Sequence, residues 1–315
     1  MILSLPFWEF VGISAGIYAI FALGLQLQFG HAGLMNFGHV AFMAIGSYTM
    51  ALLIYHLAFS MWLAAIIAIA VAMVVGALLA FPTVRVRADY LAITTIAFGE
   101  IIRILILNQV SITRGPRGLF GFTSDFTNFV NLVEDATASV GIRLGRDRVL
   151  LVMVWLVVAL ILLVLRRLVR SPWGRVLRAI REDEDAARAL GKNVFVYKLQ
   201  VMAIGSALAA VAGIFLSFQL LFLSPDSFEP VSTFFAWVIV LLGGAGQNIG
   251  VPVGALVFAV IFAGTRFAAF WPFSLLSASD LASVRMIVIG CLLIALMAFR
   301  PQGIFGKREE LLLDR

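Results

Sequence analysis

Residues 57–84 read LAFSMWLAAIIAIAVAMVVGALLAFPTV and contain no Asp, Glu, Lys or Arg. An α-helix needs about 20 apolar residues to cross the roughly 30 Å hydrocarbon core of a bilayer. This stretch is long enough, and it lacks the alternation of apolar and polar residues that strands of a membrane β-barrel show. It therefore predicts a transmembrane helix.

The same pattern recurs along the whole chain. Uncharged runs cover residues 10–25, 149–165, 199–225 and 230–265, and the last is long enough for two helices. Hydrophobic residues make up 62% of the sequence and charged residues only 13%, whereas soluble domains carry about 25% charged residues. We therefore predict an all-α polytopic membrane protein, with residues 1–315 forming a single transmembrane domain.

About nine transmembrane helices are expected. They cover residues 9–29, 37–56, 61–82, 89–108, 149–169, 199–222, 231–247, 249–266 and 283–299. The number becomes eight or ten if glycine-rich segments are broken or re-entrant instead of spanning. The first eight residues contain no Lys or Arg, and the apolar stretch after them is too long for a signal peptide, so the first helix should be retained. A disulfide within the chain is excluded because Cys291 is the only cysteine.

Basic residues are concentrated in three short segments that flank predicted helices. Residues 166–198 hold nine Lys or Arg, the tail from Arg300 holds four, and Arg85 and Arg87 add two. The positive-inside rule places such segments on the cytoplasmic side. The N-terminus is then outside, residues 109–148 form an external loop, and residues 300–315 form a cytoplasmic tail. Nucleic-acid binding is disfavoured because the basic residues flank membrane spans.

Two glycine-rich stretches form a weak internal repeat. Gly30-His31-Ala32-Gly33 is followed by Gly38, and Gly243-Gly244-Ala245-Gly246 is followed by Gly250. Small residues allow helices to pack closely, and broken helices also line substrate paths in transporters. Both interpretations stay open. The candidate pathway residues here are Gly30, His31, Gly33, Gly38, His39, Gly243, Gly244 and Gly246.

The segment between Ser171 and Lys198 predicts one amphipathic helix or two short ones. Ser171-Pro172 is a helix-start signal, and Gly191 is a plausible helix stop. Four consecutive acids, Glu182-Asp183-Glu184-Asp185, would be repelled by an anionic cytoplasmic leaflet. The mixed charge therefore favours docking of a protein partner over a helix lying on the membrane or a solvated loop.

Several stretches resemble the LivH/LivM family of branched-chain amino-acid permeases, most closely its LivM branch. The similar stretches lie within residues 22–33, 38–48, 89–103, 115–119, 173–191, 224–228 and 299–303, which cover nearly the whole chain in order. Asp185-Ala186-Ala187, followed by Gly191, is similar to the loop by which permeases of ABC importers dock on their ATPase. Asp185 stands where the broad importer pattern has Glu. Many LivM-type chains also carry an additional N-terminal span.

The resemblance implies a set of partners and a solute. Residues 170–198 would be the ATPase-coupling loop, with candidate residues Trp173, Gly174, Arg175, Arg178, Glu182, Asp185, Ala186, Ala187 and Gly191. The partners would be a second LivH-type permease, two cytoplasmic ATPase subunits that bind ATP and Mg, and an extracytoplasmic solute-binding protein. The membrane would be the cytoplasmic membrane of a bacterium or archaeon. The solute would be Leu, Ile or Val, although the same family also transports urea, short amides and other small metabolites.

The sequence contains few residue patterns that would bind a nucleotide or a metal or carry out catalysis. The nucleotide-binding pattern G-x-x-x-x-G-K-[ST] does not occur, and no His, Cys, Asp and Glu cluster has metal-ligand spacing, so neither a cofactor, a metal nor a catalytic site is expected. Glu100 and Arg103 lie three residues apart inside a predicted helix, where they either pair with each other or contact a zwitterionic solute. An ion-coupled secondary transporter is the alternative function, whereas a membrane enzyme would need a reactive constellation.

Overall fold

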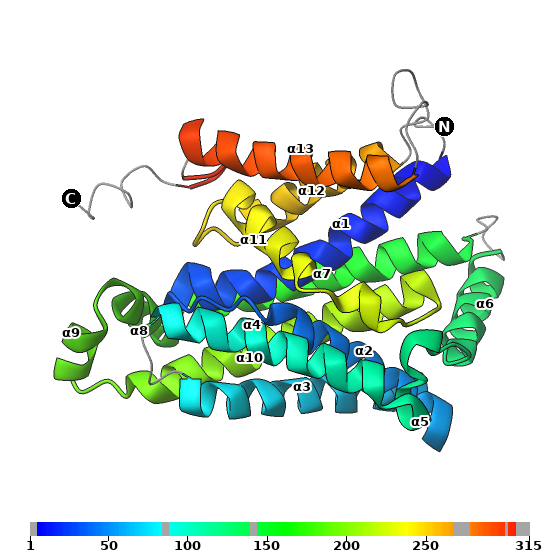
Figure 1. The fold of residues 1–315 in the computed structure, drawn as a ribbon, viewed down its shortest axis with the longest axis horizontal. Helices are drawn as coiled ribbons and strands as arrows, with labels where there is room; N and C mark the ends of the chain where they lie inside the picture. The colour runs from blue at the N-terminus through cyan, green and yellow to red at the C-terminus, as the bar shows by residue number, and fades with distance from the viewer. Residues whose placement is uncertain (1–4, 84–87, 139–143, 267–277, 300–301, 307–315) are drawn as a thin grey trace.

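A computed structural model describes residues 5–83, 88–138, 144–266, 278–299 and 302–306. The regular secondary structure in these ranges is helical, and one isolated antiparallel β-bridge joins Leu119 to Leu223. Long apolar helices run side by side along one axis (Figure 1). The predicted all-α polytopic fold is therefore confirmed.

The described residues contain nine long apolar helices at the predicted positions. They are α1 (Leu5–Leu25), α2 (His39–Leu57), α3 (Met61–Thr83), α4 (Ala88–Asn108), α7 (Arg146–Arg170), α10 (Val194–Leu220), α11 (Val231–Gly243), α12 (Gly250–Arg266) and α13 (Ala278–Phe299). Seven segments are long and apolar enough to cross a membrane, and shorter apolar segments lie in α12 and α13. α11 has 13 residues and is about 20 Å long at 1.5 Å per residue. The candidate span that contains it, Pro225–Gly243, also includes the preceding turn.

Small residues bring α1, α2, α3 and α10 close together in the interior. A Cβ atom on Gly46 of α2 would lie 2.5 Å from the Cα atom of Ala210 of α10, and one on Gly76 of α3 would lie 2.2 Å from the hydroxyl oxygen of Ser206. Hydrophobic residues in this region, such as Phe21 and Met50, are fully buried. Packing without voids is the main source of helix association inside a membrane, where lipid is as apolar as the protein.

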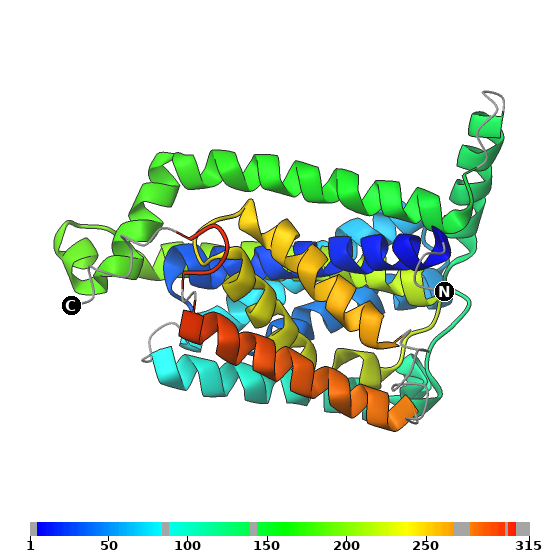
Figure 2. The same ribbon diagram turned by 90° about the horizontal axis from the view of Figure 1, so that it is seen from above.

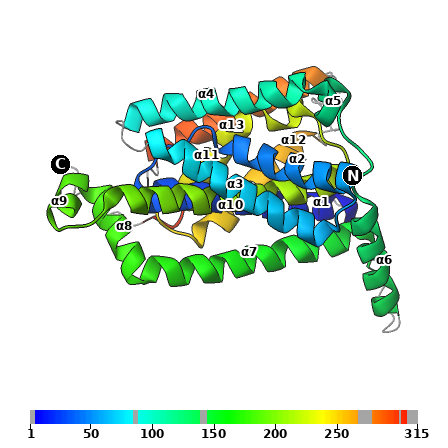
Figure 3. The ribbon, with the colours of Figure 1, turned by 90° about the horizontal axis from the view of Figure 1, so that it is seen from below.

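α4 and α7 lie on opposite edges of the bundle (Figures 2 and 3). Only 22% of the span in α4 and 33% of that in α7 is buried inside the chain. Their outward side chains include Ile93 and Leu105 on α4 and Leu156 and Leu160 on α7. These faces are suited to contact lipid or other subunits.

The two ends of the bundle carry different short helices. α8 (Pro172–Glu182) and α9 (Glu184–Ala189) lie at one end, called the α8 end below (Figure 1). α5 (Val110–Thr113) and α6 (Ser124–Ala138) lie at the opposite end, the α6 end. α6 projects beyond α7 at that end (Figure 2).

Candidate functional site: a joint between two glycine-rich breaks

The first glycine-rich break follows α1 directly. The chain passes from α1 into a π-helical turn, η1 (Gln26–His31), and then runs without regular structure to α2. The amide of Leu34 donates to the carbonyl oxygen of Gln28 at 2.9 Å, which closes the wide turn. Such π-turns interrupt helices at functional positions more often than elsewhere. The first break is thus an ordered interruption of the helix, and it lies in the most buried of the candidate spans.

Buried amide side chains hold the first break in place. Gln28 and Asn36 are both fully buried, and the Asn36 Nδ2 atom donates to the Gln28 Oε1 atom at 2.9 Å. The Asn36 Oδ1 atom accepts from the amide of Gly38 at 3.0 Å, and the Gln28 Nε2 atom donates to the Met202 carbonyl oxygen of α10 at 3.4 Å. Each bond satisfies a polar group that would otherwise be buried alone.

Neighbouring helices supply further polar contacts where the chain enters α2. The amide of Phe37 donates to the Thr95 hydroxyl of α4 at 3.1 Å, and the amide of Val40 donates to the Thr233 hydroxyl of α11 at 3.0 Å. The Nε2 atom of His39, a fully buried residue, lies 3.2 Å from the Phe21 carbonyl oxygen. The start of α2 is therefore fixed by both α4 and α11.

The second glycine-rich break, between α11 and α12, is closed by backbone contacts. A Cβ atom on Gly250 would lie 2.0 Å from the Gly243 carbonyl oxygen, so only glycine permits this approach. The amide of Ile304 donates to the Leu242 carbonyl oxygen at 2.8 Å, and that of Phe305 donates to the Gly243 carbonyl oxygen at 3.3 Å. The turn at residues 302–306 thus satisfies carbonyl groups at the end of α11.

The two breaks, far apart in sequence, meet each other. The Gln26 Nε2 atom donates to the Gly244 carbonyl oxygen at 3.2 Å, and the His31 Nε2 atom lies 2.8 Å from the Asn248 Oδ1 atom. A Cβ atom on Gly30 would lie 2.8 Å from the amide nitrogen of Gly246. We call residues 26–31 and 243–250 together the glycine joint.

α8 is attached to the first break of this joint. The Arg181 Nη1 atom donates to the Gly30 carbonyl oxygen at 2.5 Å. Gly33 lies over the same arginine, because a Cβ atom on Gly33 would be 3.7 Å from the Arg181 Cα atom. A displacement of α8 would therefore act directly on the end of α1.

α8 and α9 form two short helices within the predicted coupling segment. α8 begins at Pro172 as expected, and the Asp183 side chain caps α9 by accepting from the amides of Asp185 and Ala186. Ala187 is buried against Ile180 and Val194. Glu184 and Arg188 form an ion pair at 2.5 Å, and the Glu184 carboxylate also contacts the Lys198 Nζ atom at 2.5 Å.

The remaining predicted coupling residues divide into braced and exposed positions. The Trp173 indole donates to the Gln200 Oε1 atom at 2.8 Å, and Gly174 is buried against the Val169 backbone. Gly191 has a φ of 76°, which fits a helix stop. The exposed residues are Arg175, Arg178, Glu182, Asp185 and Ala186. Their role in docking stays a prediction.

Glu100 and Arg103 pair with each other on α4. The Glu100 Oε1 atom lies 2.5 Å from the Arg103 Nη2 atom, and the Oε2 atom accepts from Nε at 3.0 Å. Gly38 contacts the same helix at Thr95, and Arg103 lies about 12 Å further along the helix axis at 1.5 Å per residue. The pair thus lies about two helical turns beyond the point where α4 contacts Gly38.

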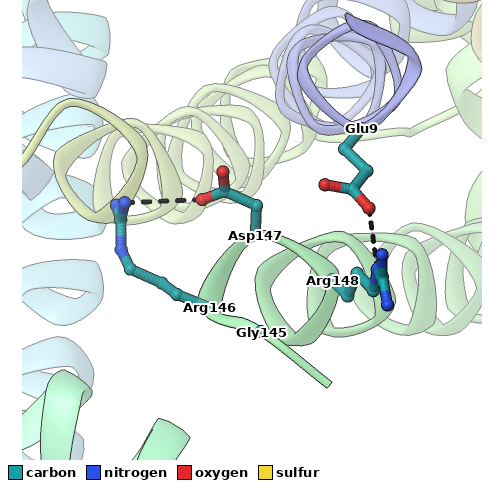
Figure 4. A pocket seen from close by; sticks show the side chains of 5 residues that line it. All are labelled: Glu9, Gly145, Arg146, Asp147 and Arg148. Atoms are coloured by element: carbon teal, nitrogen blue, oxygen red, sulfur yellow. Dashed lines mark hydrogen bonds and ion pairs between the residues drawn. The ribbon is translucent and has the colours of Figure 1, made fainter. Parts of the chain in front are cut away.

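The α6 end of α7 carries its own polar pocket, of about 360 Å³ (Figure 4). The Arg148 Nε atom lies 2.8 Å from the Glu9 Oε1 atom of α1, and Arg146 contacts both Asp147 and the Phe218 carbonyl oxygen of α10. These contacts tie α1, α7 and α10 together. We therefore interpret the residues of this pocket as structural contacts that hold the three helices together.

Sequence reasoning did not single out several residues that form the joint or contact it. They are Gln26, Gln28, Asn36, Arg181 and Asn248. Gln26 and Gln28 stand inside an otherwise apolar span, which was a usable signal because polar groups buried in a membrane need partners. Nothing local in the sequence indicates that Arg181 contacts Gly30.

Comparison with known proteins identifies the family. Residues 9–297 match the family described as branched-chain amino acid transport system, permease component. The chain belongs to this family. It is 37% identical to the high-affinity branched-chain amino acid transport system permease protein LivM of Escherichia coli K12 over 91% of this chain and 67% of that protein.

LivH-type proteins match at lower identity. The chain is 28% identical to the LivH permease protein of Salmonella typhimurium over 95% of both chains. It is also 28% identical to the BraD permease protein of Pseudomonas aeruginosa over 95% of this chain and 94% of that protein. The resemblance to the LivM branch is thereby confirmed. No solved structure matches the chain.

Proposed function

We propose that this chain is one permease subunit of an ATP-driven importer for Leu, Ile and Val. The family match over residues 9–297 carries the proposal. The chain is a multi-pass membrane permease, and its relatives are named as branched-chain amino acid permeases. The permease supplies a path through the membrane, and ATP with Mg is bound by separate subunits.

The proposed assembly contains a second, LivH-type permease, two ATPase subunits and a solute-binding protein. The ATPases dock at the α8 end, where the exposed acids and arginines of α8 and α9 offer mixed charge. The binding protein docks at the α6 end. This orientation places the N-terminus outside and the C-terminus inside, because residues 166–198 at the α8 end hold nine Lys or Arg.

Coupling between ATP and transport passes through Arg181 in this proposal. Closure of the ATPases displaces α8, and the Arg181–Gly30 contact transmits the displacement to η1. Because η1 contacts Gly244 and Asn248, the first break moves against the second. α1 and α11 then change their relative position, which opens the path to alternate sides of the membrane.

The decisive experiment is transport by the reconstituted complex. Proteoliposomes containing both permeases, the ATPases and the binding protein should accumulate radiolabelled leucine only when ATP is present. Urea and short amides serve as competing solutes, and an imposed proton or sodium gradient serves as the alternative energy source. Uptake driven by an ion gradient without ATP would overturn the proposal.

Cysteine labelling tests the orientation. In a Cys291→Ser background, cysteine at Leu132 of α6 should react with an impermeant reagent added outside intact cells, and cysteine at Leu190 should not. Both positions are highly exposed, at 67% and 79%, so burial within the chain does not limit the reaction. The opposite labelling pattern would reverse the assigned sides.

A further inference from the structure

The α8 end of α7 carries three arginines around a surface cavity. The cavity has a volume of about 440 Å³ and is lined by Leu163, Arg166, Arg167, Arg170 and Ser171. Within the described part of the chain, none of the three arginines forms an ion pair or a hydrogen bond through its side chain. Three like charges within five residues repel one another, so the cavity favours an anion.

The two ends of α7 differ in how their arginines are satisfied. At the α6 end, Arg146 contacts Asp147 and the Phe218 carbonyl oxygen, and Arg148 pairs with Glu9 (Figure 4). At the α8 end, no acidic residue lines the cavity. The three arginines at this end are exposed, and the cavity that they line offers them no counter-charge.

The start of α8 adds to the positive potential at the cavity. Ser171 precedes α8, but its hydroxyl donates to the Leu168 carbonyl oxygen at 2.7 Å and caps no amide of α8. The first amides of α8 therefore lack a side-chain acceptor from the residue before the helix. A helix N-terminus carries partial positive charge and accommodates phosphate groups.

An exposed apolar stripe runs along α7 below this cavity. Leu156, Leu160 and Leu163 are 65%, 59% and 59% exposed and lie about one turn apart. α7, which carries them, lies at an edge of the bundle (Figure 3). A free anion would occupy the arginine-lined cavity and leave the leucine stripe uncovered. An anionic phospholipid would fill the cavity with its headgroup and cover the stripe with its acyl chains. Guanidinium groups bind phosphate oxygens in pairs, and acyl chains pack on leucine side chains.

We propose that Arg166, Arg167 and Arg170 bind the phosphodiester headgroup of an anionic phospholipid, whose acyl chains lie along Leu156, Leu160 and Leu163. The site is independent of the transported solute. The bound lipid fixes the depth of α7, and therefore of α8, at the membrane surface. The three arginines provide the headgroup contacts, and the cavity between them is the headgroup position.

Lipid retention by the purified full-length chain tests the site. The protein is incubated with phosphatidylglycerol or phosphatidylcholine of identical acyl chains, and the bound lipid is measured by native mass spectrometry. Wild type should retain phosphatidylglycerol in preference to phosphatidylcholine. The triple variant Arg166→Gln/Arg167→Gln/Arg170→Gln should lose this preference, with about a fivefold loss in affinity for each arginine removed.

Two control variants separate a built site from general charge. Arg148→Gln removes one arginine from the other end of α7 and should leave retention unchanged. The triple variant Arg166→Lys/Arg167→Lys/Arg170→Lys keeps all three positive charges and should fold like wild type. It should retain less phosphatidylglycerol, because lysine cannot make the bidentate contact that a guanidinium group makes with phosphate. Thermal unfolding of each variant shows whether the protein is intact.

Four results would overturn the proposal. Equal retention of the two lipids by wild type would remove the headgroup preference. Unchanged retention in a folded glutamine variant would place the lipid elsewhere. Displacement of phosphatidylglycerol by millimolar glycerol phosphate would show that the site takes a free anion, and loss of the ATPase subunit with unchanged lipid would show that the arginines face a protein.

Discussion

The two glycine-rich breaks look alike in sequence but are held by different means. The first break is locked by buried side chains, chiefly Gln28 and Asn36, which hydrogen-bond to each other and to backbone atoms. The second is locked by contact between the backbones at Gly243 and Gly250. The first break can therefore loosen when one side chain changes partners, whereas the second is held by its backbone. An added Cβ atom would clash at either break, 1.9 Å from the Thr95 carbonyl oxygen at Gly38 and 2.0 Å from the Gly243 carbonyl oxygen at Gly250. This difference suggests that the first break moves during transport while the second stays fixed.

The largest expected effect is at the second break. Gly250→Ala would place a methyl group 2.0 Å from the Gly243 carbonyl oxygen, so α11 and α12 must separate. Overpacking of this kind costs about 3 kcal/mol when the obstacle is backbone. The variant should show a large drop in thermal unfolding midpoint and in yield of monodisperse protein.

Gly264→Ala is the matched control for this substitution. It makes the same change in the same helix, but the structure places nothing within 4 Å of the added Cβ atom. Its stability should equal or slightly exceed that of wild type, because alanine favours helix. Equal loss in both variants would mean that helix propensity, and not contact at the break, explains the effect.

A smaller effect is expected at the first break from Gln28→Leu. The side chain is fully buried, and its loss leaves the Asn36 Nδ2 atom without its acceptor. An unsatisfied buried donor costs about 2 kcal/mol. Chemical or thermal unfolding of the purified chain measures the loss.

Gln247→Leu provides the corresponding test at the second break. The backbone of Gln247 forms bonds with Gly244 and Gly250, and the substitution leaves them in place. Its stability should change by less than about 0.5 kcal/mol. If Gln247→Leu is as harmful as Gln28→Leu, side chains hold both breaks and the contrast between them is wrong.

The sequence was sufficient to predict the helices and the ends of the coupling segment. Long uncharged runs such as residues 57–84 have few alternatives to a transmembrane helix. Ser171-Pro172 and Gly191 act through local backbone geometry, so the start of α8 and the positive φ after α9 were also predictable.

Contacts between distant segments were not predictable in this way. The pairing of His31 with Asn248 and of Arg181 with Gly30 depends on how α1, α8 and α11 are arranged. Glycine in a membrane helix is compatible with close packing and with a pathway, and composition does not distinguish them. The structure shows close backbone approaches at Gly30 and Gly250. Whether the joint also lines the path stays a prediction.

Gly191 requires glycine for a different reason from the glycines at the breaks. Its φ is 76°, and nothing lies within 4 Å of an added Cβ atom, so the requirement is purely conformational. Gly191→Val should cost about 1–2 kcal/mol, since the left-handed region disfavours a side chain branched at Cβ. Redirection of the chain after α9 should abolish stimulation of ATP hydrolysis by the loaded binding protein.

Gly191→Asn is the control, because asparagine tolerates left-handed backbone better than other side chains. It should keep most of the stimulation. Asp185→Ala, which removes an exposed contact with Arg188, should be mild as well. Wild-type stimulation in Gly191→Val would show that the segment from α8 to α9 does not couple the subunits.

A small effect on stability, and the sharpest test of the contrast between the breaks, is expected from Arg181→Ala. The arginine is exposed apart from its bond to the Gly30 carbonyl oxygen, so its removal should cost about 1 kcal/mol. If the first break is the moving element, transport per ATP hydrolysed should fall severalfold while the unfolding midpoint barely changes. Arg181→Lys should restore part of the coupling because its ammonium can still donate to the carbonyl. Arg175→Ala removes an equally exposed arginine of α8 that does not contact the joint, and it controls for the loss of charge. A transport-to-hydrolysis ratio that stays at the wild-type value in Arg181→Ala would show that α8 drives the membrane helices by another route, and the first break would then be as passive as the second.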